Sequence, residues 1–293
     1  MSALQALRPG LSCQQAVRLV AAAFRQADTD CAQDDDARIL VLAATGLSRV
    51  ALIAEPETAL SPAAATRLVA MVRRRLAHEP VTRILGRREF WGLEFVVTSA
   101  VLDPRADSET VVGAALRAMA ARRGERLRIL DLGTGSGALL CALLTEFPRA
   151  IGLGIDLAPD AAAVAAQNVQ RLGLAARGAI SVGAWAASAA ACFDLVVSNP
   201  PYITSADIPR LDPEVRLYDP LLALDGGDSG FDAYATLARQ IPQVLAPASA
   251  VCIEAGAGQA ARISQIFAAC GLATAAVDTD LGGHARCVTL RRA

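Results

Sequence analysis

Residues 127–137, Leu-Arg-Ile-Leu-Asp-Leu-Gly-Thr-Gly-Ser-Gly, run from a short apolar segment into three closely spaced glycines. The segment Leu127–Leu132 is typical of a buried β-strand, and an apolar helix is expected from about Ala138. Glycines between the two let the backbone turn tightly and approach a ligand without an interfering Cβ atom. The stretch therefore predicts a strand, a ligand-binding loop and a helix in succession.

The chain after this loop alternates between expected strands and helices. Strands are expected at Ile151–Asp156, near Ile180, at Phe193–Ser198, at Ala250–Glu254 and at Arg286–Leu290, with a helix from about Pro159. Such alternation is typical of a mostly parallel sheet that is covered by helices on both faces. We therefore predict an α/β fold of the doubly wound, Rossmann-like class.

The chain before this loop has a different pattern. Val17, Val20 and Phe24 follow helical spacing, and Ser61-Pro62 is a typical helix start. No strand pattern occurs before Phe90, after which Gly and Pro residues bound a short hairpin. We divide the chain into a small all-helical domain (1–86), a β-hairpin linker (87–105) and an α/β domain (106–293).

Composition limits the class of protein. The 293 residues suffice for two domains, and a net charge of −1 gives no overall field that would attract nucleic acid. Seven cysteines without a paired spacing and two histidines argue against a metal site, so none is predicted. The chain shows neither a signal peptide nor an apolar run of about 18 residues, which favours a cytoplasmic protein without membrane contact.

The glycine-rich loop indicates a cofactor that contains a nucleoside. Asp156 ends the second strand of the sheet, where an acidic side chain accepts hydrogen bonds from ribose hydroxyls. Gly133, Gly135 and Ala138 also satisfy a loose dinucleotide fingerprint, so a nicotinamide cofactor remains an alternative on this evidence alone.

A second motif, Asn199-Pro200-Pro201-Tyr202, follows the strand Phe193–Ser198. The Asn199 side chain and the Pro200 carbonyl are two acceptors on a rigid backbone, suited to gripping both N–H bonds of an NH2 group. Such a grip turns the nitrogen lone pair toward an electrophilic methyl group, while the Tyr202 ring can stack on a flat amide. The motif favours N-methylation from S-adenosylmethionine and has no use in a nicotinamide enzyme.

With these motifs in place, the chain resembles the PrmC/HemK family, the N5-glutamine methyltransferases of peptide chain release factors. The resemblance covers most of the chain, and the helical part and the hairpin are its most specific components. The matching segments are Gly46-Leu47-Ser48-Arg49, Glu79-Pro80-Val81, Gly86–Gly92, Pro104-Arg105 with Asp107 and Glu109, Asp131–Gly137 and Asn199–Tyr202.

The resemblance implies a function, a cofactor and a partner. S-adenosyl-L-methionine would be the cofactor, and the helical domain would dock a release factor whose Gly-Gly-Gln loop carries the target glutamine. A monomer without stable nucleic-acid binding is expected. The implied cofactor-binding residues are Gly133, Thr134, Gly135, Ser136, Gly137, Asp156, Trp185 (against the adenine) and Asn199; the implied catalytic residues are Asn199, Pro200, Pro201 and Tyr202.

The chain departs from the family pattern at several positions. Ala184 stands where the family has an Asp that bonds the adenine, and Asp103 and Ala106 replace an apolar residue and a Pro. Arg73–Arg75, with Arg87 and Arg88, form a basic cluster, for which a solvated helix face is expected and contact with an acidic release-factor surface is the alternative. Two alternative functions stay open: a nucleic-acid amino-methyltransferase and a catalytically silent release-factor-binding adaptor.

Overall fold

The computed structural model describes residues 6–27, 33–189 and 191–293. Residues 1–5, which begin the segment without a signal-peptide pattern, and Cys31, one of the seven cysteines, lie outside these ranges. The chain divides into two compact units, Met1–Gly86 and Arg87–Ala293. No helix within the described ranges has the length and apolar character needed to cross a membrane.

The first unit is helical, as its sequence pattern predicts. Ser12, Ser48 and Ser61 cap three of its helices by accepting hydrogen bonds from backbone N–H groups, and Ser12 forms a reciprocal capping box with Gln15. The apolar faces of the helices meet in one core. The helices are α2 (Cys13–Gln26), α3 (Gln33–Thr45), α4 (Arg49–Ala54), α5 (Pro62–Leu76) and α6 (Val81–Leu85).

The basic cluster expected on a solvated face is not a continuous surface. Arg75 is 1% exposed, and its Nε donates to Asp36 Oδ2 at 2.7 Å. Arg74 is exposed and pairs with Glu79 at 2.5 Å. The expectation of a solvated face was therefore wrong for Arg75, whose position on α5 turns its guanidinium toward α3, where burial requires an acidic partner.

The second unit opens with a hairpin of β1 (Arg87–Phe90) and β2 (Leu93–Val96). The two-residue turn Trp91-Gly92 has positive φ at both positions (53° and 69°), as a type I′ hairpin turn requires. Glu109 holds the non-glycine turn residue by accepting from the Trp91 backbone N–H at 2.8 Å. Phe90 and Phe95 enter the core of this unit, so the hairpin is part of the unit rather than a free-standing connector.

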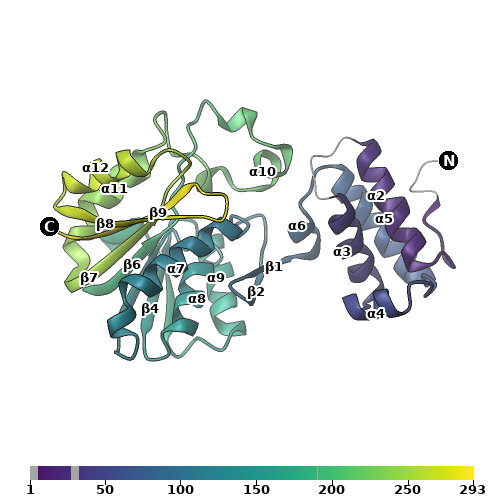
Figure 1. Ribbon diagram of the computed structural model, residues 1–293, viewed down its shortest axis with the longest axis horizontal. Helices are drawn as coiled ribbons and strands as arrows, with labels where there is room; N and C mark the ends of the chain where they lie inside the picture. Colours follow the sequence, from purple (N-terminus) through teal and green to yellow (C-terminus); the bar gives the residue numbers. More distant parts are fainter. Residues whose placement is uncertain (1–5, 28–32, 190) are drawn as a thin grey trace. The chain divides into compact units, whose positions relative to one another are not determined.

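A seven-stranded sheet in the order β5-β4-β3-β6-β7-β9-β8 forms the centre of the second unit. Figure 1 shows helices on both sides of this sheet. Strands β3 to β7 pair in parallel, and β9 lies antiparallel to both β7 and β8. The strands are β3 (Arg128–Leu132), β4 (Ile151–Asp156), β5 (Gly178–Val182), β6 (Phe193–Ser198), β7 (Leu245–Glu254), β8 (Leu272–Thr279) and β9 (Ala285–Arg292).

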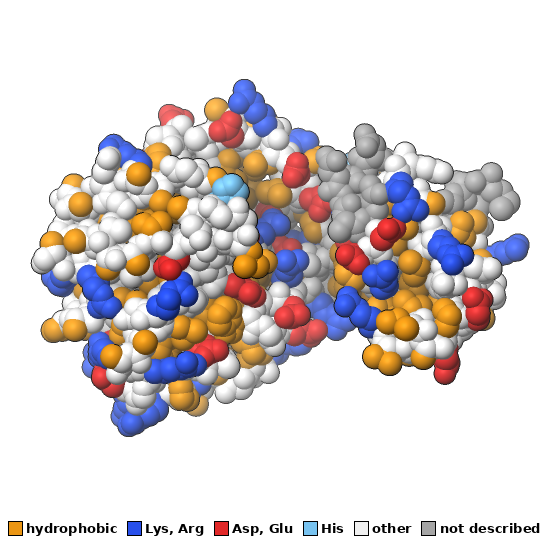
Figure 2. Space-filling view, viewed as in Figure 1, with side chains coloured by type: hydrophobic (Ala, Val, Ile, Leu, Met, Phe, Trp, Pro, Cys, Tyr) orange, Lys and Arg blue, Asp and Glu red, His pale blue; other side chains and the backbone are white. Residues whose placement is uncertain are grey.

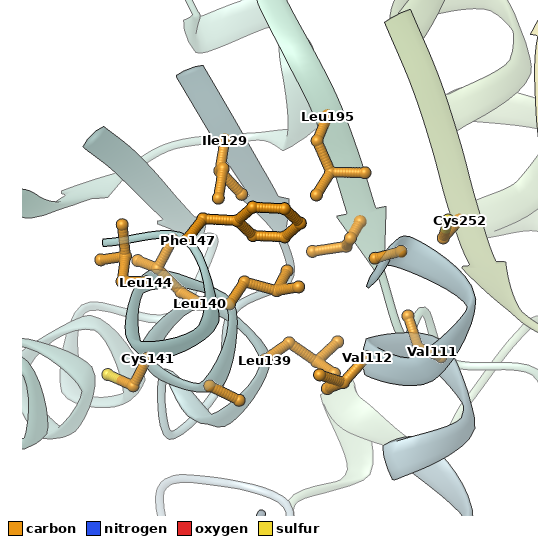
Figure 3. Packing of buried hydrophobic residues seen from close by; sticks show 14 of the residues in the cluster. Val111, Val112, Ile129, Leu139, Leu140, Cys141, Leu144, Phe147, Leu195 and Cys252 are labelled. Atoms are coloured by element: carbon orange, nitrogen blue, oxygen red, sulfur yellow. The ribbon is translucent and has the colours of Figure 1, made fainter. Parts of the chain in front are cut away.

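Helices cover both faces of the sheet, and the predicted doubly wound α/β class is confirmed. On one face α7 (Glu109–Ala118), α8 (Ala138–Glu146) and α9 (Pro159–Arg171) enclose a core in which the Phe147 ring lies between Ile129 and Leu195 (Figure 3). On the other face, α11 (Asp232–Gln240) and α12 (Ala260–Ala268) cover a second core, which includes the buried Tyr234 side chain of α11.

Several elements lie outside the sequence prediction. Strand β8 was missed because its residues are mostly exposed and Ala-rich, so they show little alternation of apolar and polar residues. The remaining short helices are α10 (Pro213–Tyr218) and the 3₁₀ helices η1 (Ala106–Ser108), η2 (Ala120–Arg122), η3 (Trp185–Ser188), η4 (Ile208–Arg210), η5 (Leu221–Ala223) and η6 (Ile241–Val244).

Candidate active site

The strand order reverses between β3 and β6, and the two predicted motifs meet there. The chain proceeds from β3 to β4 and β5 on one side and then returns to β6 on the other side of β3. Leu132 at the end of β3 pairs with Ser198 at the end of β6, and Ser198 Oγ donates to the Leu132 carbonyl at 2.6 Å. Parallel α/β sheets bind ligands at such a switch point, and a cavity of about 370 Å³ opens here.

The glycine-rich loop is folded tightly around the end of β4. Gly133, Gly135 and Gly137 have φ angles of 70°, 54° and 80°, a region that favours glycine over other residues. The N–H groups of Gly133 and Thr134 both donate to the Ile155 carbonyl, at 2.9 and 3.0 Å. A Cβ atom at Gly137 would make only ordinary contacts with Ala165, so the positive φ rather than crowding is what favours glycine there.

Asp156 organises this loop as well as lining the cavity. Its Oδ2 accepts from the Gly135 N–H at 2.8 Å, and its Oδ1 accepts from the Ala158 N–H at 2.9 Å. Each carboxylate oxygen can accept a further hydrogen bond. Asp156 is therefore fixed in orientation and still able to receive ribose hydroxyls.

Asp131 is a second carboxylate of the loop, and it is buried. The Thr134 hydroxyl donates to Asp131 Oδ2 at 2.6 Å, while Oδ1 has no hydrogen-bond partner among the described residues. Burial raises the pKa of Asp131 to about 7, against the lowering effect of the Thr134 hydrogen bond. This side chain fixes the start of the loop and is ionised only in part at neutral pH.

Trp185 covers the loop from the side of η3. A Cβ atom at Gly133 would lie 3.3 Å from Trp185 Cζ3, so the indole ring is in contact with the loop backbone. The ring lines the cavity and also packs partly against the core around α11 and α12. The preceding Ala184 is exposed, and its N–H donates to Ser188 Oγ at 3.1 Å. The side chain of Ala184 offers no acceptor for an adenine amino group.

Asn199 also lines the cavity, and its side chain is held by Ser108 of η1. Its Nδ2 donates to Ser108 Oγ at 3.1 Å. Ser108 also lines the cavity. Burial raises the pKa of the nearby Glu254, the last residue of β7, to about 7, against the lowering effect of the Ser108 side chain. Because the amide donates through Nδ2, its Oδ1 is left as the acceptor that can serve a ligand in the cavity.

Tyr202 is the last residue of the Asn199-Pro200-Pro201-Tyr202 motif, here called the tetrad, and its position is fixed through its backbone. The Tyr202 carbonyl accepts from Gln259 Nε2 at 3.1 Å, and Gln259 Oε1 accepts from the Gly256 N–H at 3.2 Å. The Tyr202 side chain packs partly against the core around Tyr234. Burial raises the pKa of Tyr202, so its hydroxyl stays protonated at physiological pH.

Most of the residues predicted from the sequence line one cavity. Those at its wall are Gly133, Thr134, Gly135, Ser136, Asp156, Trp185, Asn199 and Pro201, whereas Gly137, Pro200 and Tyr202 are not among the lining residues. Ser108, Glu254, Asp131 and Gln259 were not predicted to be part of the site. Ser108 lies between Asp107 and Glu109 in η1, and Glu254 ends the apolar run of β7. Only tertiary folding brings Ser108 to Asn199.

A segment between β6 and α11 is attached to the cavity wall by an ion pair. Arg105 Nη2 donates to Asp219 Oδ2 at 2.5 Å, and the Asp219 side chain is almost fully buried. Leu222, from the same segment, lines the cavity and is 54% exposed. The wall beside Asn199 is thus partly apolar and open to a large ligand.

Comparison with known proteins agrees with this arrangement. Residues 15–86 match the family model of the PrmC N-terminal domain, and residues 111–210 match that of the methyltransferase small domain. The chain is 48% identical over 257 residues to a release factor glutamine methyltransferase of Rhodospirillum rubrum, covering 88% of this chain and 78% of the relative. It is 47% identical over 288 residues to that of Bradyrhizobium diazoefficiens, covering 97% and 96%, and 41% identical over 259 residues to that of Agrobacterium fabrum, covering 88% and 90%. The chain therefore belongs to the release factor glutamine methyltransferase family.

Proposed function

We propose that this protein transfers a methyl group from S-adenosyl-L-methionine to the side-chain amide nitrogen (N5) of the glutamine in the Gly-Gly-Gln loop of peptide chain release factors. The observation that carries the proposal is the placement of Asn199 at the end of β6, with its Oδ1 free as an acceptor at the wall of the cavity that the glycine-rich loop also lines. The reaction takes place in the cytoplasm, where release factors meet the ribosome, and a monomer suffices for it.

The residues around the glycine-rich loop fit this cofactor. S-adenosylmethionine supplies an electrophilic methyl group on a positively charged sulfur. Thr134 and Ser136 with the loop glycines would hold its methionine part, and the fixed Asp156 carboxylate would accept from its ribose hydroxyls. The Trp185 ring would lie against the adenine, where a flat aromatic surface stabilises a base by stacking.

The tetrad would make the amide nitrogen reactive. An amide lone pair is delocalised into the carbonyl, so the nitrogen is a poor nucleophile until its lone pair is directed at the methyl carbon. Asn199 Oδ1 and the Pro200 carbonyl would accept from the two N–H bonds and hold the nitrogen in line with the methyl–sulfur bond. Such positioning can supply several kcal/mol of barrier reduction.

The remaining step needs no strong base. The nitrogen lone pair would form the new N–C bond as the methyl–sulfur bond breaks, with the electron pair of that bond left on sulfur. The methylated nitrogen is then acidic and loses one proton to water. Tyr202, which stays protonated, would shield one side of the amide rather than act as a base.

The helical unit, residues 1–86, would recognise the release factor, and the hairpin in residues 87–105 would connect it to the methyltransferase domain. Val50 and Ile53 on α4 are 75% and 74% exposed, unusually high values for large apolar side chains within one short helix. Residues 15–86 match the PrmC N-terminal family model. Exposed apolar side chains next to one another are typical of a protein-binding surface.

The two alternative functions fit the protein less well. A nucleic-acid methyltransferase needs a basic groove, but Figure 2 shows basic and acidic side chains interspersed over the visible face of the larger unit, and the net charge is −1. A catalytically silent adaptor would have no use for Asn199 Oδ1, the acceptor that remains when Nδ2 donates to Ser108.

The proposal is tested by incubating the purified protein with cofactor carrying a labelled methyl group and with purified release factor, DNA or ribosomal RNA. We expect label in the release factor alone, and loss of the label when the loop glutamine is changed to alanine. Label in a nucleic acid would support the first alternative. Intact calorimetric binding of cofactor and release factor without any turnover would support the adaptor.

A further inference from the structure

A buried amide joins the glycine-rich loop to the hairpin. Asn168 of α9 is 0% exposed, and its side chain makes three hydrogen bonds to backbone groups. Oδ1 accepts from the Val96 N–H at 2.8 Å, while Nδ2 donates to the Val96 carbonyl at 3.0 Å and to the Ser136 carbonyl at 2.9 Å. Val96 is the last residue of β2, so one side chain connects the hairpin with the loop after β3.

The three bonds require an amide at this position. Two of them need a donor and the third needs an acceptor, so the partners fix the orientation of the Asn168 side chain. Among side chains of this size, only a primary amide has two N–H donors and an acceptor oxygen. A carboxylate would place its oxygens against two carbonyl oxygens, and an aliphatic side chain would offer nothing to the three backbone groups.

The Ser136 carbonyl belongs to a peptide unit that is held at both ends. Its oxygen accepts from Asn168, and the nitrogen of the same peptide, that of Gly137, donates to the Thr134 carbonyl at 2.8 Å. Gly135 and Gly137 on either side have positive φ angles, and glycine lets an adjacent peptide rotate at little steric cost. The two hydrogen bonds together oppose such a rotation.

The orientation of this peptide shapes the cavity wall. Gly135 and Ser136 line the cavity, whereas Asn168 is not among its lining residues. Ser136 is 4% exposed, so its carbonyl depends on a partner within the protein, and leaving it unpaired would be unfavourable. A loop without the Asn168 bond would therefore populate several shapes, and a ligand that fits one of them would bind more weakly.

We propose that Asn168 is a positioning residue for S-adenosylmethionine, because it holds the glycine-rich loop in the shape that receives the methionine part of the cofactor. The inference rests on the proposed role of this loop in cofactor binding. The three hydrogen bonds of the Asn168 side chain end on the hairpin and the loop, not on the tetrad. Asn168 thus acts on cofactor affinity and not on the transfer step.

Two substitutions at position 168 test the proposal. Asn168→Asp keeps the shape and the acceptor for the Val96 N–H but loses both donors, so we expect the calorimetric Kd for S-adenosylmethionine to rise about tenfold or more. Asn168→Ser, whose hydroxyl can donate to one carbonyl, should raise the Kd by about three- to tenfold. In both variants kcat at saturating cofactor and the KM for release factor should stay within about threefold of the wild type.

Arg177→Ala is the matched control, at the other end of α8. Arg177 donates to the backbone carbonyls of Leu144, Phe147 and Ala150 at 2.8, 3.2 and 3.0 Å. Its replacement also deprives backbone carbonyls of a side-chain donor, so the melting temperature should fall as it does in the Asn168 variants. The cofactor Kd should stay at the wild-type value, because α8 meets the glycine-rich loop at its first residue, Ala138.

The outcomes separate this inference from the proposed function. If the wild type binds no S-adenosylmethionine, the proposed cofactor site fails and the inference with it. If the wild type binds the cofactor but methylates no release factor, the proposed function fails, while the Kd values still test the inference.

The inference alone is overturned if the wild type is active and a folded Asn168 variant keeps the wild-type Kd. An equal rise of the Kd in Arg177→Ala would also overturn it, since a general loss of stability would then explain the effect. A fall in kcat at saturating cofactor would show that Asn168 acts on the transfer step and would contradict the proposal as well. If Asn168→Asp does not fold, Asn168→Ser decides by the same criteria. A graded rise of the Kd with unchanged kcat would support the proposal.

Discussion

The backbone N–H of Gly135 donates to Oδ2 of Asp156 at 2.8 Å, joining the glycine-rich loop after β3 to the end of β4. One carboxylate thus fixes the loop and faces the cavity in which a ribose would lie. Replacing Asp156 should therefore affect loop order and cofactor affinity together.

We predict that Asp156→Ala weakens S-adenosylmethionine binding at least about tenfold, because the ribose loses a charged acceptor and the Gly135 and Ala158 N–H groups lose theirs. Isothermal titration calorimetry measures the Kd. Asp160→Ala, in the exposed first turn of α9, is the matched control and should bind as the wild type does. An unchanged Kd in Asp156→Ala would contradict the cofactor site.

Replacing Ala184 by Asp should increase the affinity for S-adenosylmethionine. The family resemblance implies an Asp at this position, and the exposed Ala184 side chain leaves room for one. One hydrogen bond to the adenine amino group is worth about 0.5 to 1.5 kcal/mol, so Ala184→Asp should lower the cofactor Kd by about two- to tenfold. Ala187→Asp, on the exposed side of η3, controls for added charge. Equal affinities in all three proteins would show that the adenine does not lie beside residue 184.

The buried Asp131 predicts how stability depends on pH. Its pKa is raised from 3.8 to about 7 by burial, so the folded state keeps a proton that the unfolded state releases between these values. The free energy of unfolding should then fall as pH rises from about 4 to about 7, by up to about 1.4 kcal/mol per pH unit for this group.

Asp131→Asn removes this titration and should give a shallower decline, measured by urea unfolding across the pH range. Glu254, whose pKa is also raised to about 7, remains in the variant and should leave a residual decline of the same sign. Equal slopes in the wild type and the variant would show that Asp131 ionises normally in the folded protein.

The exposed apolar pair on α4 predicts where the release factor binds. A charge that replaces an apolar side chain at the centre of a protein-binding surface destabilises the complex. Val50→Asp combined with Ile53→Asp should therefore raise the KM for release factor about tenfold or more and leave the cofactor Kd unchanged. Val277→Asp, on an exposed apolar position of β8, is the matched control. Equal KM values in the two variants would place the docking surface elsewhere.

The sequence was sufficient to predict the sheet class and the two motifs that meet at the switch point. Glycine spacing, the acidic end of a strand and the Asn-Pro-Pro-Tyr motif are local signals, and each lies beside the same cavity because parallel strands end at one edge of a sheet. The elements that the sequence did not predict, such as β8, are those in which apolar and polar residues alternate only weakly.

The supporting residues could not be predicted in the same way. Ser108 contacts Asn199 across 91 residues of the chain. Likewise, the burial of Arg75 depends on Asp36, which lies 39 residues earlier on another helix. Such contacts arise from tertiary packing and leave no local pattern in the sequence.

In the proposed mechanism Asn199 has the central role in methyl transfer. One measurement tests this role most directly: the single-turnover rate of methyl transfer to release factor by Asn199→Ala, with the cofactor Kd determined on the same preparation. The loss of Oδ1 should abolish detectable transfer while the Kd stays within about threefold of the wild type. A transfer rate equal to that of the wild type would contradict the role of Asn199 and, with it, the proposed mechanism.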